Sequence, residues 1–110
     1  MPVGRVDRMT VEELHERWEQ DRDAIQVLDV RERPEWDSGR IPGSIHRPYH
    51  DIRDLPAGLD PERPVAAICG SGQRSAVGAS LLKRLGVRQV IHVSEGGVPR
   101  WRRKGWPVER

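Results

Sequence analysis

Short apolar runs recur along this chain and are separated by charged segments and by glycine or proline residues. Three of these runs, over residues 24–30, 64–69 and 89–93, are rich in β-branched or small apolar side chains. Such short runs are typical of buried strands, and residues 44–45 are expected to form a further short strand. The pattern therefore predicts a sheet with a buried interior.

Helix signals lie before and between these runs. Thr10 and Glu13 have the spacing of a capping box. Val11, Leu14 and Trp18 then recur at helical spacing. A short amphipathic helix is therefore predicted from about Thr10, with its apolar stripe covering the sheet.

A longer helix is predicted over residues 73–85, directly after the strand at 64–69. Gly86 can end this helix in a left-handed conformation. Short helical segments are expected at residues 35–36 and 51–55, and a last helix holds Val98 and Trp101. The buried face of the longer helix is expected to consist of Val77, Leu81, Leu82 and Leu85.

Strands that alternate with helices over short connections predict an α/β fold: a sandwich with a central, mainly parallel sheet and helices on both faces. The length of 110 residues suits one compact domain, here expected over residues 1–110. Ligands of such sheets bind beyond the carboxyl ends of the strands, and Cys69 lies at that edge.

Charge changes this picture little. The net charge is +2, and acidic residues are scattered among the arginines, so the sequence predicts no nucleic-acid partner. The densest basic stretch lies around Trp101 and is interpreted as a solvated helix face, with docking of an acidic or phosphate-bearing partner as the alternative. This stretch consists of Arg100, Arg102, Arg103 and Lys104.

A single cysteine cannot form an internal disulfide, and residues 1–7 lack the apolar core of a secretory signal. No apolar run approaches the length of a membrane span. The expectation is a soluble cytoplasmic protein with no membrane partner, whereas the sequence does not indicate its oligomeric state.

The segment from Cys69 to Ser75 joins a predicted strand to a helix N-terminus, where unpaired main-chain N–H groups and the helix dipole favour anions. Gly70 and Gly72 allow several N–H groups to converge on one point. A thiolate at that point would have a pKa below the usual value of about 8.5 and would be a reactive nucleophile at neutral pH.

Three motifs resemble the signatures of the rhodanese family, in the right order and over nearly the whole chain. One is the loop from Cys69 to Arg74. The second lies within residues 28–46, with Leu-Asp-Val-Arg-Glu, then Trp36, then Gly-Arg-Ile-Pro-Gly-Ser-Ile-His. The third lies within residues 96–108, with Gly-Gly-Val, Trp101, and later glycine, proline and valine. The chain therefore resembles a single-domain sulfurtransferase with the rhodanese-like three-layer sandwich.

The resemblance implies that Cys69 takes a sulfane sulfur from a donor, holds it as a persulfide and yields it to a thiol or other nucleophile, without a cofactor. Asp29 and Arg31 are expected to support the scaffold, bonded to the loop or to each other. Arg74 has two open roles, an ion pair with a carboxylate or contact with an anionic substrate. The anion-binding loop would consist of Gly70, Ser71, Gly72, Gln73, Arg74 and Ser75.

The sulfur donor stays open. The Cys-Gly-Ser-Gly start of the loop is similar to that of mercaptopyruvate-type enzymes, but those loops usually end in threonine where this chain has Arg74. Loops of thiosulfate-specific enzymes often place basic residues directly after the cysteine, where Gly70 and Ser71 stand. Thiosulfate, mercaptopyruvate, glutathione persulfide and a protein persulfide remain candidates, with a small or protein thiol as the acceptor.

Two other functions are weighed. The chain is alternatively a noncatalytic sulfur-relay or protein-interaction module, including one domain of a longer protein. A phosphatase is disfavoured because similar phosphatases have a longer loop between the cysteine and the arginine than the four residues between Cys69 and Arg74.

The histidines are scattered along the chain, and no metal site is expected from their spacing. A dyad of Cys69 with His46 is a minor alternative. The tryptophans Trp36, Trp101 and Trp106 are interpreted as packing residues, one of which would line the mouth of the cleft. The histidines are His15, His46, His50 and His92.

Overall fold

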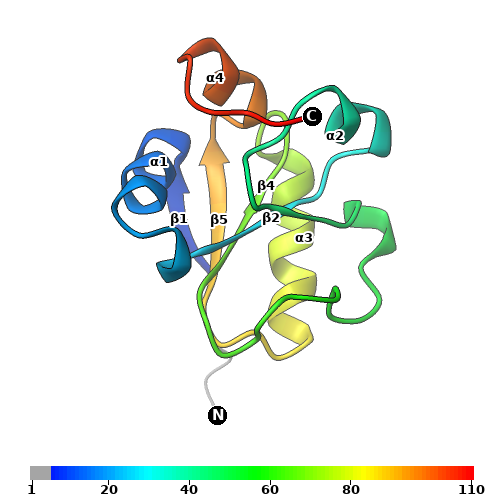
Figure 1. Cartoon of the computed structure of the whole chain (residues 1–110). Helices are drawn as coiled ribbons and strands as arrows, with labels where there is room; N and C mark the ends of the chain where they lie inside the picture. The colour runs from blue at the N-terminus through cyan, green and yellow to red at the C-terminus, as the bar shows by residue number, and fades with distance from the viewer. Residues whose placement is uncertain (1–5) are drawn as a thin grey trace.

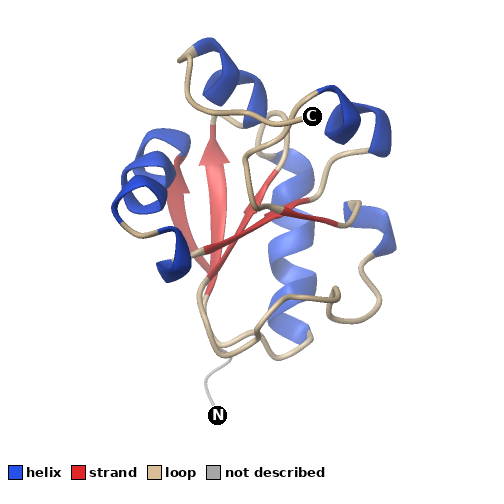
Figure 2. Ribbon diagram, viewed as in Figure 1, coloured by secondary structure: helices blue, strands red, loops and turns tan. Residues whose placement is uncertain are grey.

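A sheet of five parallel strands forms the centre of the computed structural model, which describes residues 6–110 (Figures 1 and 2). The expectation about a secretory signal concerns residues 1–7 and so lies mostly outside the described part. The strand order is β1-β5-β4-β2-β3. The strands are β1 (Val6–Thr10), β2 (Gln26–Asp29), β3 (Ile45–His46), β4 (Val65–Ile68) and β5 (Val90–Glu95).

Helices cover both faces of this sheet, which confirms the predicted α/β class (Figure 2). The α-helices are α1 (Val11–Gln20), α2 (Arg33–Ser38), α3 (Gln73–Arg84) and α4 (Val98–Arg103), and η1 (Arg22–Ala24) and η2 (Tyr49–Asp51) are 3₁₀ turns. The capping box predicted at Thr10 and Glu13 is present at the start of α1. Within the described residues, no helix is long and apolar enough to cross a membrane.

Strand residues alternate between two hydrophobic clusters, one on each face of the sheet. Ile91 and Val93 pack with Leu14 of α1 and Trp101 of α4. Val90 packs on the other face, with residues of α3 that include Leu82. Because a parallel sheet places the carboxyl ends of its strands at one edge, the loop after β4 and the start of α4 meet there.

One strand was missed in the sequence, and two expectations were wrong. The edge strand β1 was not predicted, because Asp7 and Arg8 interrupt its apolar pattern. The expected helix at residues 51–55 is absent, since the helical turn η2 ends at Asp51. Val77 was expected on the buried face of α3, but 47% of its surface is exposed.

Leu82 lies on the buried face of α3 as predicted, but the other buried residues of this helix are small: Ser75, Gly78 and Ala79. A Cβ atom at Gly78 would lie 3.0 Å from Cγ1 of Val30. The helix therefore packs close to the sheet, and this places its N-terminus at the end of β4.

Candidate active site

The loop between β4 and α3 curls tightly around the side chain of Cys69. Gly72, the N-cap residue of α3, has a φ of +101°, in the left-handed region that favours glycine. A Cβ atom there would lie 2.6 Å from the carbonyl oxygen of Ser94 on β5. Both the backbone conformation and this close approach therefore require glycine at the base of the loop.

The sulfur of Cys69 lies inside the curl, and the residue has no exposed surface. The main-chain N–H of Gly72 donates to Sγ over 3.0 Å, and the hydroxyl of Ser75 lies 3.4 Å from it. Burial raises the pKa of the Cys69 thiol, but hydrogen bonds from the Ser75 hydroxyl and from the N–H groups of Ser71, Ser75 and Gly72 outweigh it. The pKa therefore lies below its ordinary value, and the thiolate is favoured.

Two further side chains meet the same loop at the carbonyl oxygen of Gly72. The Ser75 hydroxyl lies 3.1 Å from this oxygen and 3.4 Å from the carbonyl oxygen of Val93. Nε2 of His92, on β5, lies 2.7 Å from the same Gly72 oxygen. The loop is thus fixed to the neighbouring strand as well as to its own helix.

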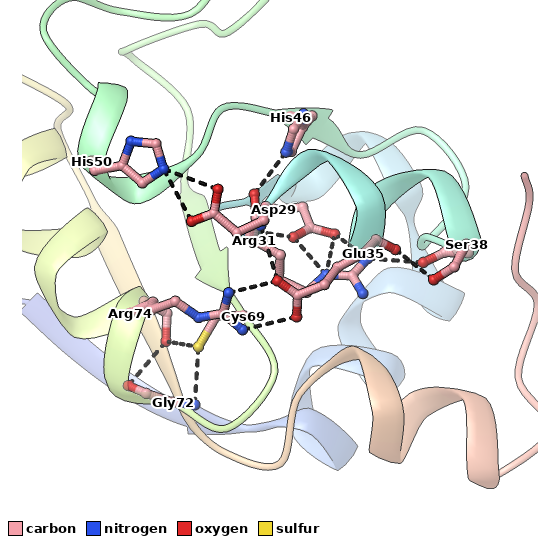
Figure 3. A network of polar contacts seen from close by, with 12 residues as sticks. Asp29, Arg31, Glu35, Ser38, His46, His50, Cys69, Gly72 and Arg74 are labelled. Atoms are coloured by element: carbon pink, nitrogen blue, oxygen red, sulfur yellow. Dashed lines mark hydrogen bonds and ion pairs between the residues drawn. The ribbon is translucent and has the colours of Figure 1, made fainter.

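Arg74 reaches from the start of α3 to Glu35 on α2, beside the sulfur of Cys69 (Figure 3). Its two terminal nitrogens lie 2.6 and 3.0 Å from the two carboxylate oxygens of Glu35. This bidentate pair lowers the pKa of Glu35 and raises that of Arg74. Of the two roles left open for Arg74, the ion pair with a carboxylate is observed.

Asp29 and Arg31 bond to each other rather than to the loop. Arg31 donates to both carboxylate oxygens of Asp29, the shortest contact being 2.7 Å, and also to the carbonyl oxygen of Gly39 at the end of α2. Both side chains are buried. The pair therefore fixes α2, and with it Glu35, relative to the end of β2.

His46 and His50 contact α2 and the residues directly before it. Nε2 of His46 donates to the carbonyl oxygen of Arg31 over 2.8 Å, and its ring stacks on Trp36. Nε2 of His50 lies 3.0 Å from Glu32. Among residues 6–110, the hydrogen-bond partners of the Cys69 sulfur all lie in its own loop, so the dyad of His46 with Cys69 is not formed.

The start of α4 closes the loop from the other side. The N–H of Val98 donates to the carbonyl oxygen of Cys69 over 3.0 Å. A Cβ atom on Gly97 would lie 2.3 Å from that oxygen and 2.6 Å from the carbonyl oxygen of Gly70. Gly97, which belongs to the third sequence motif, is thus needed because the backbone before α4 is in contact with the backbone of the loop after β4.

Sequence reasoning missed two residues of this site, Glu35 and His92. Glu35 is separated from Arg74 by 39 residues and His92 from Gly72 by 20, so no local pattern links them. Within residues 6–110, no three side chains of His, Cys, Asp or Glu are grouped as metal ligands. The arrangement places one buried sulfur, whose thiolate form is favoured, among main-chain donors.

Comparison with known proteins gives related sequences and structures over most of the chain. The family model for the rhodanese-like domain matches residues 10–104. The thiosulfate sulfurtransferase GlpE of Pseudomonas savastanoi pv. phaseolicola is 34% identical over 76 residues, which are 69% of this chain and 71% of that protein. YrkF of Bacillus subtilis, named as a candidate sulfur carrier protein, is 30% identical over 94 residues, 86% of this chain but 50% of that protein. The chain thus spans half the length of YrkF.

Among solved structures, a rhodanese-related protein from Thermoplasma volcanium superimposes with a TM-score of 0.75 at 34% sequence identity. The match covers 94% of this chain and 97% of that one. The five-stranded parallel sheet and its covering helices therefore have a known structural counterpart.

Proposed function

Because the chain belongs to the rhodanese-like domain family, we propose that it transfers a sulfane sulfur from a donor to a nucleophilic acceptor through a persulfide on Cys69. The observation that carries this proposal is the convergence of main-chain N–H groups and the Ser75 hydroxyl on a buried sulfur. A cysteine that served only as a core residue would not need such donors.

The proposed reaction has two half-reactions. The Cys69 thiolate attacks the outer sulfur of the donor, so that a new S–S bond forms and the donor's bond to that sulfur breaks. The electron pair of the broken bond leaves with the rest of the donor, which is sulfite when the donor is thiosulfate. An acceptor thiolate then attacks the outer sulfur of the persulfide and restores the Cys69 thiolate.

The loop's main-chain donors would stabilise negative charge in both states of the enzyme. In the free enzyme the charge lies on Sγ, and in the loaded enzyme it lies on the outer sulfur. Cys69 has no exposed surface, so the side chains at the mouth must move to admit a donor. Arg74 is one side chain that would move, because its charge acts on Cys69 and one of its terminal nitrogens would lie 3.1 Å from a Cβ atom on Gly70.

Candidate donors are thiosulfate, mercaptopyruvate, glutathione persulfide and a protein persulfide, and the acceptor is a small or protein thiol. The name of GlpE favours thiosulfate as the first donor to assay. A thiol that must stay reduced suits the cytoplasm. The second candidate function is a noncatalytic relay module, which consists of residues 1–110 alone or is one domain of a longer protein. The name of YrkF as a sulfur carrier and its greater length favour this candidate.

The test is intact mass spectrometry of the protein after incubation with each donor. Wild type and Val77→Ala, a change at an exposed position of α3, are expected to gain one sulfur atom, and Cys69→Ser is expected to gain none. Addition of a thiol should remove the adduct. Absence of an adduct with every donor, or Cys69-dependent hydrolysis of an aryl phosphate instead, would contradict the proposal.

Kinetics of the unloading step separate the two candidates. Rapid turnover with a small donor and a small thiol supports an enzyme. A persulfide that small thiols discharge slowly, but that passes quickly to a protein thiol, supports a relay module.

A further inference from the structure

His92 meets the loop from a strand that carries none of the residues expected to act in the reaction. It lies two positions after Val90 on β5 and therefore faces α3, and its side chain is half-buried. Nε2 lies 2.7 Å from the carbonyl oxygen of Gly72. Because a carbonyl oxygen only accepts hydrogen bonds, Nε2 carries a proton and donates it.

The Gly72 oxygen is also within reach of Ser75. The Ser75 hydroxyl has one proton but three neighbours: the Gly72 oxygen at 3.1 Å, the Val93 oxygen at 3.4 Å and the Cys69 sulfur at 3.4 Å. When Cys69 is a thiol, its S–H can donate to Ser75. When Cys69 is a thiolate, the bond reverses, and Ser75 must turn its proton away from the carbonyl oxygens.

The Gly72 oxygen does not need the Ser75 proton. A carbonyl oxygen has two lone pairs, and that of an N-cap residue accepts the first hydrogen bond of the helix. His92 occupies the remaining position at a shorter distance than Ser75 does. The Gly72 oxygen therefore has its two hydrogen bonds without a proton from the Ser75 hydroxyl.

We propose that His92 is a positioning residue, which occupies the Gly72 carbonyl and thereby leaves the Ser75 hydroxyl free to donate to the anionic sulfur of Cys69. The inference deepens the proposed function, because it rests on Cys69 acting as a thiolate. His92 does not touch the sulfur and acts through Ser75.

The test measures the pKa of Cys69 by titration of thiolate ultraviolet absorbance, read as the difference from the same variant carrying Cys69→Ser. The chain has one cysteine, so the signal belongs to Cys69 alone. In His92→Leu the Ser75 proton returns to Gly72, and the thiol pKa should rise by about 0.5–1 unit, the equivalent of one hydrogen bond. His92→Gln keeps a donor and should restore most of the shift.

A double-mutant cycle with Ser75→Ala shows whether the effect passes through Ser75. Ser75→Ala alone should raise the pKa, and adding His92→Leu to it should raise the pKa no further. Arg74, a charged side chain that interacts with Cys69, is unchanged in every variant. If His92→Leu does not fold, His92→Phe takes its place as a ring without a donor.

An unchanged pKa in His92→Leu overturns the inference, as does an equal rise in the presence and absence of Ser75. The titration needs no sulfur donor. A protein that forms no persulfide but shows the predicted coupling would therefore contradict the proposed function and leave the role of His92 standing.

Discussion

Gly97→Ala should destabilise the protein through a backbone collision at the active loop. The φ of Gly97 is 174°, an extended conformation open to any residue, so the cost does not come from its own backbone. It comes from a Cβ atom that would lie 2.3 and 2.6 Å from the carbonyl oxygens of Cys69 and Gly70. Neither oxygen belongs to a flexible side chain, so the loop or α4 must move.

The expected loss follows from two effects. Overpacking of a filled site costs about 1–3 kcal/mol. Loss of the Val98 N–H bond to the Cys69 oxygen, 3.0 Å long, adds about 1 kcal/mol. Replacing glycine by alanine also restricts the unfolded chain, which offsets about 0.4–1 kcal/mol of the loss.

Gly70→Ala is the matched control. Gly70 also lies in the site, and its φ is outside the left-handed region, so alanine there adds no backbone strain. Both variants replace glycine by alanine and therefore restrict the unfolded chain to the same extent. A Cβ atom on Gly70 meets a side-chain nitrogen of Arg74 at 3.1 Å rather than a backbone atom, and a side chain can shift at less cost than the backbone. The two variants should therefore differ in free energy of unfolding by about 2–4 kcal/mol, with Gly97→Ala the less stable.

Urea denaturation measures this difference, with an unchanged m value showing that the unfolded state is comparable. Thermal unfolding should show a midpoint lower by about 4–8 °C for each kcal/mol in a domain of this size. Equal stability of the two variants would refute the claim that the start of α4 lies too close to the loop for residue 97 to carry a Cβ atom.

Substitutions at Asp29 and Glu35 test the wall of the site formed by α2, with Asp37→Asn as the control for Asp29→Asn. Asp29→Asn leaves the buried Arg31 charge without its partner and should cost about 3–5 kcal/mol in urea denaturation, whereas Asp37→Asn, in the exposed pair with Arg33, should cost less than about 1 kcal/mol. Similar losses of stability in Asp29→Asn and Asp37→Asn would contradict the claim that burial makes the pair with Arg31 the more important one. Glu35→Gln should cost less than about 1 kcal/mol at neutral pH because the pair with Arg74 is partly exposed. The pKa of Glu35 is lowered on folding, so this contribution is complete above the unfolded pKa of about 4.3 and is lost as the pH falls through the folded value. A stability difference between wild type and Glu35→Gln that grows on acidification would refute this assignment.

The sequence carried much of the information on the loop because its signals are local. Strand, glycine turn and helix follow one another within residues 64–85, and the periodicity of each is visible in the chain. The same holds for the capping box at Thr10, whose partners are three residues apart. The local geometry of these two segments was therefore predictable to within a few residues.

What escaped prediction depends on contacts between distant segments. The ion pair of Arg74 with Glu35 and the bond of His92 to Gly72 arise only when separate strands bring these residues to one edge of the sheet. Val77 was misplaced because hydrophobicity alone favours large residues in the core. Close packing of α3 on the sheet instead selects Gly78 and Ala79 for the interface.

Two positions of the loop can change over evolution without loss of a donor to the sulfur. Ser71 contributes its main-chain N–H to the sulfur, and the side chains of Ser71 and Gln73 are exposed. Substitutions at these two positions can alter which molecules approach the mouth and leave in place the main-chain N–H groups and the Ser75 hydroxyl that hold the sulfur. If Cys69 carries sulfur as proposed, substrate preference can diversify at these two positions without a change at the cysteine, and they are the positions to vary in a library that selects new sulfur donors.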